Sequence, residues 1–203
     1  MGLVSFLVLF KMDKIQKALN KAYEVHDGYR KGTTIPYFVH ILDVAKYLMF
    51  ETNDEDVICA GILHDTLEDS TYSKEELIED FGLNVFSLVD FCTEPGNTVD
   101  KSTVEKKSWR SRKEHSIERV KDARYEELLV FAADKLSNVL SMQEDLICIE
   151  YENKSEDELW SRFNSSKEDI EWYYKSSLKE VEPMLKDTRL FKVLKRRVEE
   201  VFG

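Results

Sequence analysis

Residues 57–70 read VICAGILHDTLEDS. The first half is an apolar run typical of a buried segment, and the second half carries His64, Asp65, Glu68 and Asp69. On one helix, residues four apart share a face with about 5–6 Å between their Cβ atoms, which pairs His64 with Glu68 and Asp65 with Asp69. Glu68 and Asp69 could simply close the helix, but carboxylates at a helix C-terminus oppose the helix dipole. Because buried charge is costly without a partner, we infer that a divalent cation binds here.

Two other segments carry an ionisable side chain inside an apolar helical pattern. His40 lies in residues 36–45, PYFVHILDVA, and Asp134 lies in residues 129–138, LVFAADKLSN. Each has a simpler alternative: His40 as a hydrogen-bonded histidine of the core, and Asp134 as the partner of the adjacent Lys135. Both segments could instead complete the shell of the cation.

Helical periodicity dominates the rest of the chain, which contains only three prolines and seven glycines. The pattern predicts helices at residues 15–25, 36–50, 53–70, 73–82, 83–93, 108–121, 125–150 (with a possible break after Ser141), 155–164, 166–181 and 187–202. We therefore expect an all-α, single-domain bundle of about eight to ten helices over residues 12–203. Residues 1–11 contain an apolar run too short to span a bilayer and are expected to be an extension outside the domain. A short strand or a partner-binding tail is the alternative for them.

Charge and cysteine content narrow the classes of function. The chain has 29 Lys and Arg residues against 40 Asp and Glu, a formal net charge of −11. Such a chain is a poor non-specific binder of nucleic acid or of an anionic membrane. Its three cysteines are far apart and form no CxxC motif, so we expect small core residues in a reducing, cytoplasmic compartment.

The order of His40, then His64-Asp65, then Asp134 resembles that of the HD-domain metal-dependent phosphohydrolases. Further motifs are similar to the hydrolase domain of RelA/SpoT-type enzymes and to the stand-alone small alarmone hydrolases. These motifs are YRKG at 29–32, PYFVH at 36–40, HDTLED at 64–69, FG at 81–82 and ADKLSN at 133–138. The resemblance covers roughly residues 13–180 and implies an HD-type helical bundle.

The resemblance also implies a metal centre. Its ligands would be His40, His64, Asp65 and Asp134, with Mn²⁺ as the usual ion of the family. Mixed nitrogen and oxygen ligands suit Mn²⁺, although spacing alone leaves Fe, Zn and Mg open.

The remaining implied roles concern water and nucleotide. Glu68 and Asp69 match the family's acidic pair that activates and positions water. Arg30 and Lys31 match basic residues near the nucleotide, and Asn138 matches a substrate contact. The implied reaction removes the 3′-pyrophosphate of (p)ppGpp, giving GDP or GTP and pyrophosphate.

Residues 101–124 form a basic segment in an acidic chain, with nine Lys or Arg residues against four acids. Most of them are expected to lie on a solvated helix. A polyphosphate substrate needs cations, however, so we expect one or two of Lys107, Arg112 and Lys113 to reach phosphate oxygens.

Several departures from the family make the nucleotide less certain than the hydrolysis. The loop at His26 lacks a glutamine common in the family, and isoleucine instead of the usual proline follows His40. One alternative is an HD phosphohydrolase acting on an adenosine alarmone or a nucleoside monophosphate. Another is a non-catalytic domain that senses a nucleotide, which the intact acidic pair disfavours. His26 and His115 have no assigned role and are expected at the surface or in loops.

Overall fold

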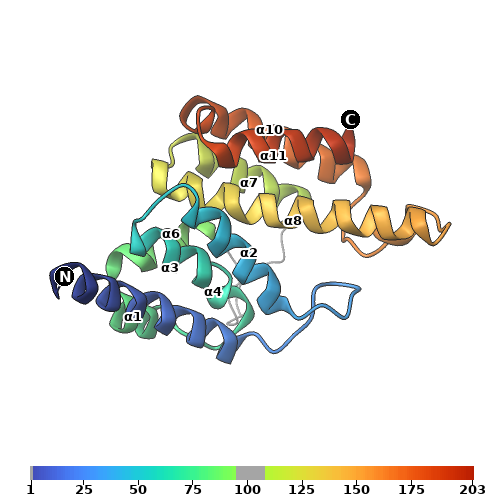
Figure 1. Ribbon diagram of the computed structural model, residues 1–203. Helices are drawn as coiled ribbons and strands as arrows, with labels where there is room; N and C mark the ends of the chain where they lie inside the picture. The colour runs from blue at the N-terminus through green and yellow to red at the C-terminus, as the bar shows by residue number, and fades with distance from the viewer. Residues whose placement is uncertain (1, 95–107) are drawn as a thin grey trace.

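The computed structural model describes the backbone of residues 2–94 and 108–203, and within these ranges the side chains from residue 14 onward. Every regular element in this part of the chain is a helix, which confirms the all-α class (Figure 1). Nine helices have eight or more residues, within the expected range, and two are single turns of four residues. The longer helices are α1 (Gly2–Val25), α2 (Tyr37–Met49), α3 (Glu55–Leu63), α5 (Lys74–Phe81), α6 (Leu83–Cys92), α7 (Trp109–Lys121), α8 (Tyr125–Tyr151), α10 (Lys167–Leu185) and α11 (Arg189–Phe202); the single turns are α4 (Thr66–Asp69) and α9 (Asp157–Trp160).

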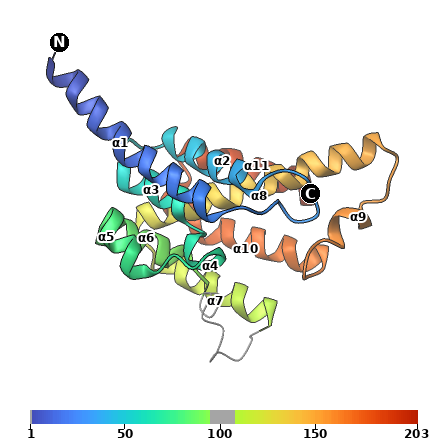
Figure 2. The same cartoon turned by 90° about the horizontal axis from the view of Figure 1, so that it is seen from below.

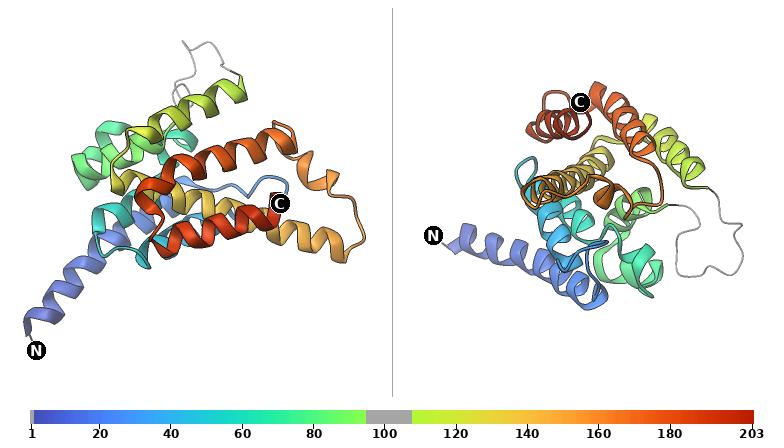
Figure 3. Two further views of the ribbon diagram at one scale, coloured as in Figure 1. Left: turned by 90° about the horizontal axis from the view of Figure 1, so that it is seen from above. Right: turned by 90° about the vertical axis from the view of Figure 1, so that its right-hand side faces the viewer.

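Helix α8 is the central element of the bundle. Helices α2, α3 and α6 pack against one side of it and α10 and α11 against the other (Figures 1 and 3). Its 27 residues contain no proline or glycine, and it runs unbroken past Ser141, where a break had been considered. One uninterrupted helix therefore connects the two layers and carries Asp134 between them.

Helix α3 is the core segment that the opening stretch predicts. Every residue from Val57 to Leu63 is buried, and the helix packs against α1, α2, α6 and α8. Its first turn carries Glu55 and Asp56, and the Asp54 side chain accepts the amide of Asp56, which caps the helix N-terminus. The partly exposed acidic start and the buried apolar body thus form one short helix.

The predicted helix over residues 53–70 is wrong at its end, because α3 stops at Leu63 and α4 starts at Thr66. Two side chains occupy carbonyls at this end: His64 Nδ1 lies 2.8 Å from the oxygen of Gly61, and the Thr66 hydroxyl donates to that of Leu63 at 2.7 Å. Side chains that satisfy these carbonyls support the end of a helix. His64 and Glu68 therefore belong to different elements.

The other differences concern element bounds. The helix expected at 155–164 is reduced to α9, whereas α10 continues to Leu185 through Pro183. The backbone of α1 is helical from Gly2, so the domain boundary predicted after Lys11 lies within a helix and stays a prediction. The first turns of α1 extend past the bundle (Figure 2). Among the described residues, no helix combines the length and the apolar composition needed to cross a bilayer.

The three cysteines do not share one environment. Cys59 is buried and Cys92 is partly buried, but Cys148 is exposed near the C-terminal end of α8. The expectation of a core position is therefore wrong for Cys148. Its apolar neighbours in sequence include Ile147, which is itself 60% exposed, so the local pattern did not reflect burial.

Gly61 allows α2 and α3 to pack closely. A Cβ atom at this position would lie 2.1 Å from Cδ1 of Leu48 and 3.3 Å from Cγ1 of Val44, both fully buried. Overfilling a packed core costs about 1–3 kcal/mol.

We expect Gly61→Val to lower the free energy of unfolding by about 3 kcal/mol, measured by urea denaturation. Gly28→Val is the matched control, because a Cβ there meets no atom within 4 Å, and equal losses in the two variants would contradict the packing argument.

Candidate metal centre and active site

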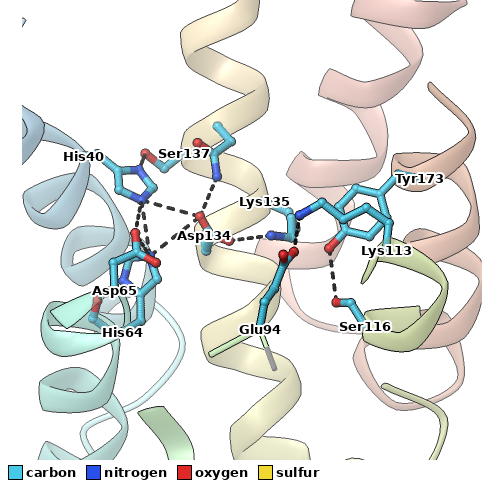
Figure 4. A network of polar contacts seen from close by, with 12 residues as sticks. His40, His64, Asp65, Glu94, Lys113, Ser116, Asp134, Lys135, Ser137 and Tyr173 are labelled. Carbon is cyan, nitrogen blue, oxygen red and sulfur yellow. Dashed lines mark hydrogen bonds and ion pairs between the residues drawn. The ribbon is translucent and has the colours of Figure 1, made fainter. Parts of the chain in front are cut away.

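Three parts of the fold bring the four predicted ligands together (Figure 4). His40 comes from α2, His64 and Asp65 from the connection between α3 and α4, and Asp134 from α8. The Nε2 atoms of His40 and His64 are 3.3 Å apart. His64 Nε2 lies 3.0 Å from Oδ2 of Asp65, and His40 Nε2 lies 3.4 Å from Oδ1 of Asp134. Two imidazoles and two carboxylates thus direct one atom each toward a common point.

The hydrogen bonds on the outer side of the two imidazoles prepare them for a cation. The Gly61 carbonyl only accepts, so His64 donates from Nδ1, and its neutral form has a free lone pair on Nε2. His40 Nδ1 lies 2.8 Å from the hydroxyl of buried Ser137, which can accept from it, and His40 Nε2 faces the cluster. This donor set fits a divalent metal ion with mixed nitrogen and oxygen ligation.

Protonation of the two histidines points to the same conclusion. Burial lowers the His64 pKa, but the carboxylates of Asp65 and Asp134 outweigh it and hold that pKa well above its ordinary value. Burial, followed by the charge of His64, lowers the pKa of His40 to about 3. The carboxylates of Asp65 and Asp134 thus favour a positive charge beside them, which a bound metal ion would supply.

Polar side chains around the cluster fix the two carboxylates. The Tyr37 hydroxyl donates to Oδ2 of Asp65. Lys135 donates to Oδ2 of Asp134, and Asn138 donates to Oδ1, both at 2.5 Å. The pair of Asp134 and Lys135 considered as an alternative therefore exists, and it leaves Oδ1 of Asp134 facing His40. Tyr37 was not among the predicted site residues, although it lies one turn before His40 and therefore on the same face of that helix.

The two residues of the predicted acidic pair lie differently. Glu68 lines the cavity next to the cluster, and its Oε1 accepts the backbone amide of Glu94 at 2.6 Å. Asp69 is exposed at the end of α4, and its amide bonds to the carbonyl of Asp65 at 3.0 Å. It is not among the lining residues of this cavity. Their roles in handling water stay predictions.

The cavity beside the cluster has a volume of about 290 Å³ and walls of mixed charge. Among the described residues, its cations are Arg112, Lys113, Arg119 and Lys135, and its acids are Asp65, Glu68, Glu94 and Asp134. The rings of Trp109 and Tyr173 cover one side, and Lys113 Nζ lies 4.8 Å from the centre of the Tyr173 ring. Arg112 and Lys113, two of the three predicted phosphate contacts, thus line the cavity beside the cluster. The third, Lys107, lies outside the described residues.

A smaller cavity of about 200 Å³ adjoins the first through Tyr37 and Asn138. Arg30 and Lys31 line it, and Arg30 donates to Oδ1 of Asn138 at 2.7 Å. Lys31 is exposed and donates to the side chain of Asn164 at 3.0 Å. The structure therefore links Arg30, through Asn138, to the carboxylate of Asp134, and leaves Lys31 at the surface.

His26 is buried, so the expectation of a surface position is wrong, whereas His115 is exposed as expected. The His26 ring centre lies 5.1 Å from that of Tyr37, and burial lowers its pKa. Packing against Tyr37 buries His26 although the next three residues of the loop are exposed, and local sequence gives no signal of this.

Comparison with known proteins supports the resemblance to HD-domain and RelA/SpoT-type enzymes. Residues 18–165 match the family model of the HD domain. A GTP pyrophosphokinase of Myxococcus xanthus is 35% identical over 133 residues, which cover 64% of this chain and 17% of that protein. A guanosine-3′,5′-bis(diphosphate) 3′-pyrophosphohydrolase of Aquifex aeolicus is 40% identical over 90 residues, covering 44% of this chain and 13% of that protein. The chain thus spans less than a fifth of these curated relatives.

Two solved structures match over nearly their whole length. A crystal structure of a Listeria monocytogenes EGD-e protein has a TM-score of 0.66 and 31% identity, covering 82% of this chain and 96% of that chain. A metazoan ortholog of SpoT that hydrolyzes ppGpp has a TM-score of 0.65 and 27% identity, covering 93% of both chains. With the His and Asp cluster at the centre of the matched region, the chain belongs to the HD-domain family, among relatives of the RelA/SpoT type.

Proposed function

We propose that the protein is a metal-dependent hydrolase that removes the 3′-pyrophosphate from guanosine nucleotides such as (p)ppGpp, giving GDP or GTP and pyrophosphate. The observation that carries this proposal is the cluster of two histidines and two aspartates beside a cavity lined by Glu68 and several cations. Two named relatives support the choice of substrate, since they are a 3′-pyrophosphohydrolase and a SpoT ortholog that hydrolyzes ppGpp.

We assign the metal to His40, His64, Asp65 and Asp134, and propose Mn²⁺ as the ion. A divalent ion held there would supply the Lewis acidity that lowers the pKa of water and polarises a phosphoryl oxygen. The protein contributes the orientation of the ligands. Ser137 orients the imidazole of His40, and the Gly61 carbonyl orients that of His64. Tyr37 holds the carboxylate of Asp65, and Lys135 that of Asp134.

We assign Glu68 as the general base. Its carboxylate lines the cavity, and the amide of Glu94 holds one of its oxygens at 2.6 Å. In the proposed reaction Glu68 accepts a proton from the attacking water, whose oxygen bonds to phosphorus as the bond from phosphorus to the 3′-oxygen breaks. The 3′-oxygen then takes up a proton from solvent and leaves as the 3′-hydroxyl of GDP or GTP. Asp69 would orient the water from the rim, since it follows Glu68 at the end of α4.

The remaining predicted contacts divide between two parts of the substrate. Arg112 and Lys113 would contact the pyrophosphate, because they line the cavity at the cluster. Arg30 and Asn138 would contact the nucleoside from the adjoining cavity, with Lys31 at its exposed edge. Lys107 stays a predicted phosphate contact.

Product analysis tests the proposal. With ppGpp and Mn²⁺, the expected products are GDP and pyrophosphate in equal amounts, and EDTA should abolish their formation. Release of single phosphate would instead indicate a phosphohydrolase of another type. Bound metal with no turnover of ppGpp would favour an enzyme for another nucleotide or a nucleotide-sensing domain.

A further inference from the structure

The side chain of Glu94 lies against Lys113 and Arg112, the two cations that the proposed function assigns to phosphate binding. Its carboxylate accepts from Lys113 Nζ at 2.5 Å (Figure 4). It also lies 3.5 Å from Arg112 Nε. The side chain is only 14% exposed. Burial would raise the Glu94 pKa, but Lys113 and the other nearby cations bring it below its usual value, so the group is a carboxylate at neutral pH.

The backbone around Glu94 is held in place independently of this carboxylate. The Glu94 amide donates to Oε1 of Glu68 at 2.6 Å. Arg119 donates to the carbonyl of Thr93 at 3.0 Å and to that of Asp90 at 3.1 Å. Contacts other than that between the Glu94 carboxylate and Lys113 thus hold the backbone from Asp90 to Glu94.

The other two cations of the cavity, among the described residues, already have different duties. Lys135 is paired with the ligand Asp134, and Arg119 bonds to backbone carbonyls. Lys113 and Arg112 are thus the pair best placed to receive an incoming anion, and both face Glu94. A phosphate group carries more charge and more acceptor oxygens than one carboxylate, so it can take over the same donors.

We infer that Glu94 is a built-in competitor for the phosphate-binding cations Lys113 and Arg112, which weakens the hold of the cavity on pyrophosphate. The carboxylate keeps the two cations paired while the cavity is empty. A bound phosphate displaces it or meets its negative charge at close range, so anions bind less tightly and the pyrophosphate product leaves more readily. This inference rests on the proposed function for the identity of its ligand.

Calorimetric titration with inorganic pyrophosphate tests the inference without requiring turnover. The protein is loaded with one equivalent of Mn²⁺, and a blank titration into Mn²⁺ alone corrects for chelation. Glu94→Gln keeps the shape and removes the charge, so the affinity for pyrophosphate is expected to rise about tenfold, the scale of losing one nearby like charge. Glu114→Gln is the matched control, because Glu114 lies on α7 beside Lys113 and pairs with Arg110 at the surface.

Glu94→Asp separates charge from mere loosening of the segment. It keeps the negative charge, so its affinity is expected to stay near that of the wild type, whereas a loosened segment would change the Asp and Gln variants alike. Unchanged or weaker binding in Glu94→Gln would overturn the inference and make Glu94 a residue that positions Lys113. Tighter binding in Glu94→Gln together with no hydrolysis of ppGpp would keep the inference and reject the proposed substrate.

Discussion

Asp65→Ala is expected to abolish metal binding and, with it, hydrolysis. Asp65 Oδ2 lies 3.0 Å from His64 Nε2 and accepts from Tyr37, so its loss removes one proposed ligand and the hydrogen-bond partner of Tyr37. Even partners outside the ligand shell cost about 10–100-fold in metal affinity, so we expect more than about 100-fold here. Titration with Mn²⁺ measures the loss directly, and the rise in unfolding temperature that Mn²⁺ gives the wild type should disappear.

Asp43→Ala is the control for this experiment. Asp43 lies on α2, one turn after His40, and pairs with Lys46 at the surface. Its removal should leave metal affinity and the stabilisation by Mn²⁺ unchanged. Retention of a bound, stabilising ion by Asp65→Ala would show that the ligands have been assigned wrongly.

Glu68→Gln is expected to keep the metal and slow turnover by about 10²-fold or more, the scale of losing a general base. Glutamine retains an Oε1 that can accept the amide of Glu94, so the 2.6 Å contact, and with it the cavity wall, should persist. The loss should therefore fall on kcat, while Mn²⁺ affinity stays near that of the wild type. Single-turnover kinetics and Mn²⁺ titration measure the two effects separately.

Glu75→Gln is the control, since Glu75 is an exposed residue in the first turn of α5. A Glu68→Gln enzyme with near wild-type kcat would remove Glu68 from the role of base and direct attention to Asp69. A loss of metal affinity would instead mean that Glu68 itself is a ligand.

The candidate ligands could be predicted because chemistry and periodicity conflict at their positions. His40 and Asp134 interrupt apolar helix faces, and His64-Asp65 ends a run that is buried from Val57 to Leu63. Such positions are costly without a partner, which makes them visible in a single sequence. Their convergence depends on three helices packing together, and here the resemblance to a family supplied what periodicity could not.

The break between α3 and α4 could not be predicted. Residues 57–70 contain no proline, and their only glycine lies inside α3. The helix ends where the side chains of His64 and Thr66 take up carbonyl groups, which is a matter of rotamers and tertiary contacts. The burial of His26 and the exposure of Cys148 have the same origin, since each depends on which element packs against it.

The number of basic residues at 101–124 did not indicate which of them are paired with an acid. The nine cations of this segment led to the expectation of one or two phosphate contacts, yet Arg110 pairs with Glu114 and Asp169, and Lys113 pairs with Glu94. Pairing across 19 positions in sequence, as between Lys113 and Glu94, leaves no local pattern. The acidic partner had to be located in three dimensions before the cations could be interpreted.

Helix α8 ties the candidate metal centre to the stability of the whole bundle. It carries Asp134, Ser137 and Asn138 while packing against α2 and α3 on one side and α10 and α11 on the other. His40 and Asp134 therefore cannot be separated by fraying of a terminus, since that would require α2 to part from α8. Amide hydrogens in the middle of α8 should consequently exchange with solvent only through global unfolding, so that these two residues stay together for as long as the chain stays folded.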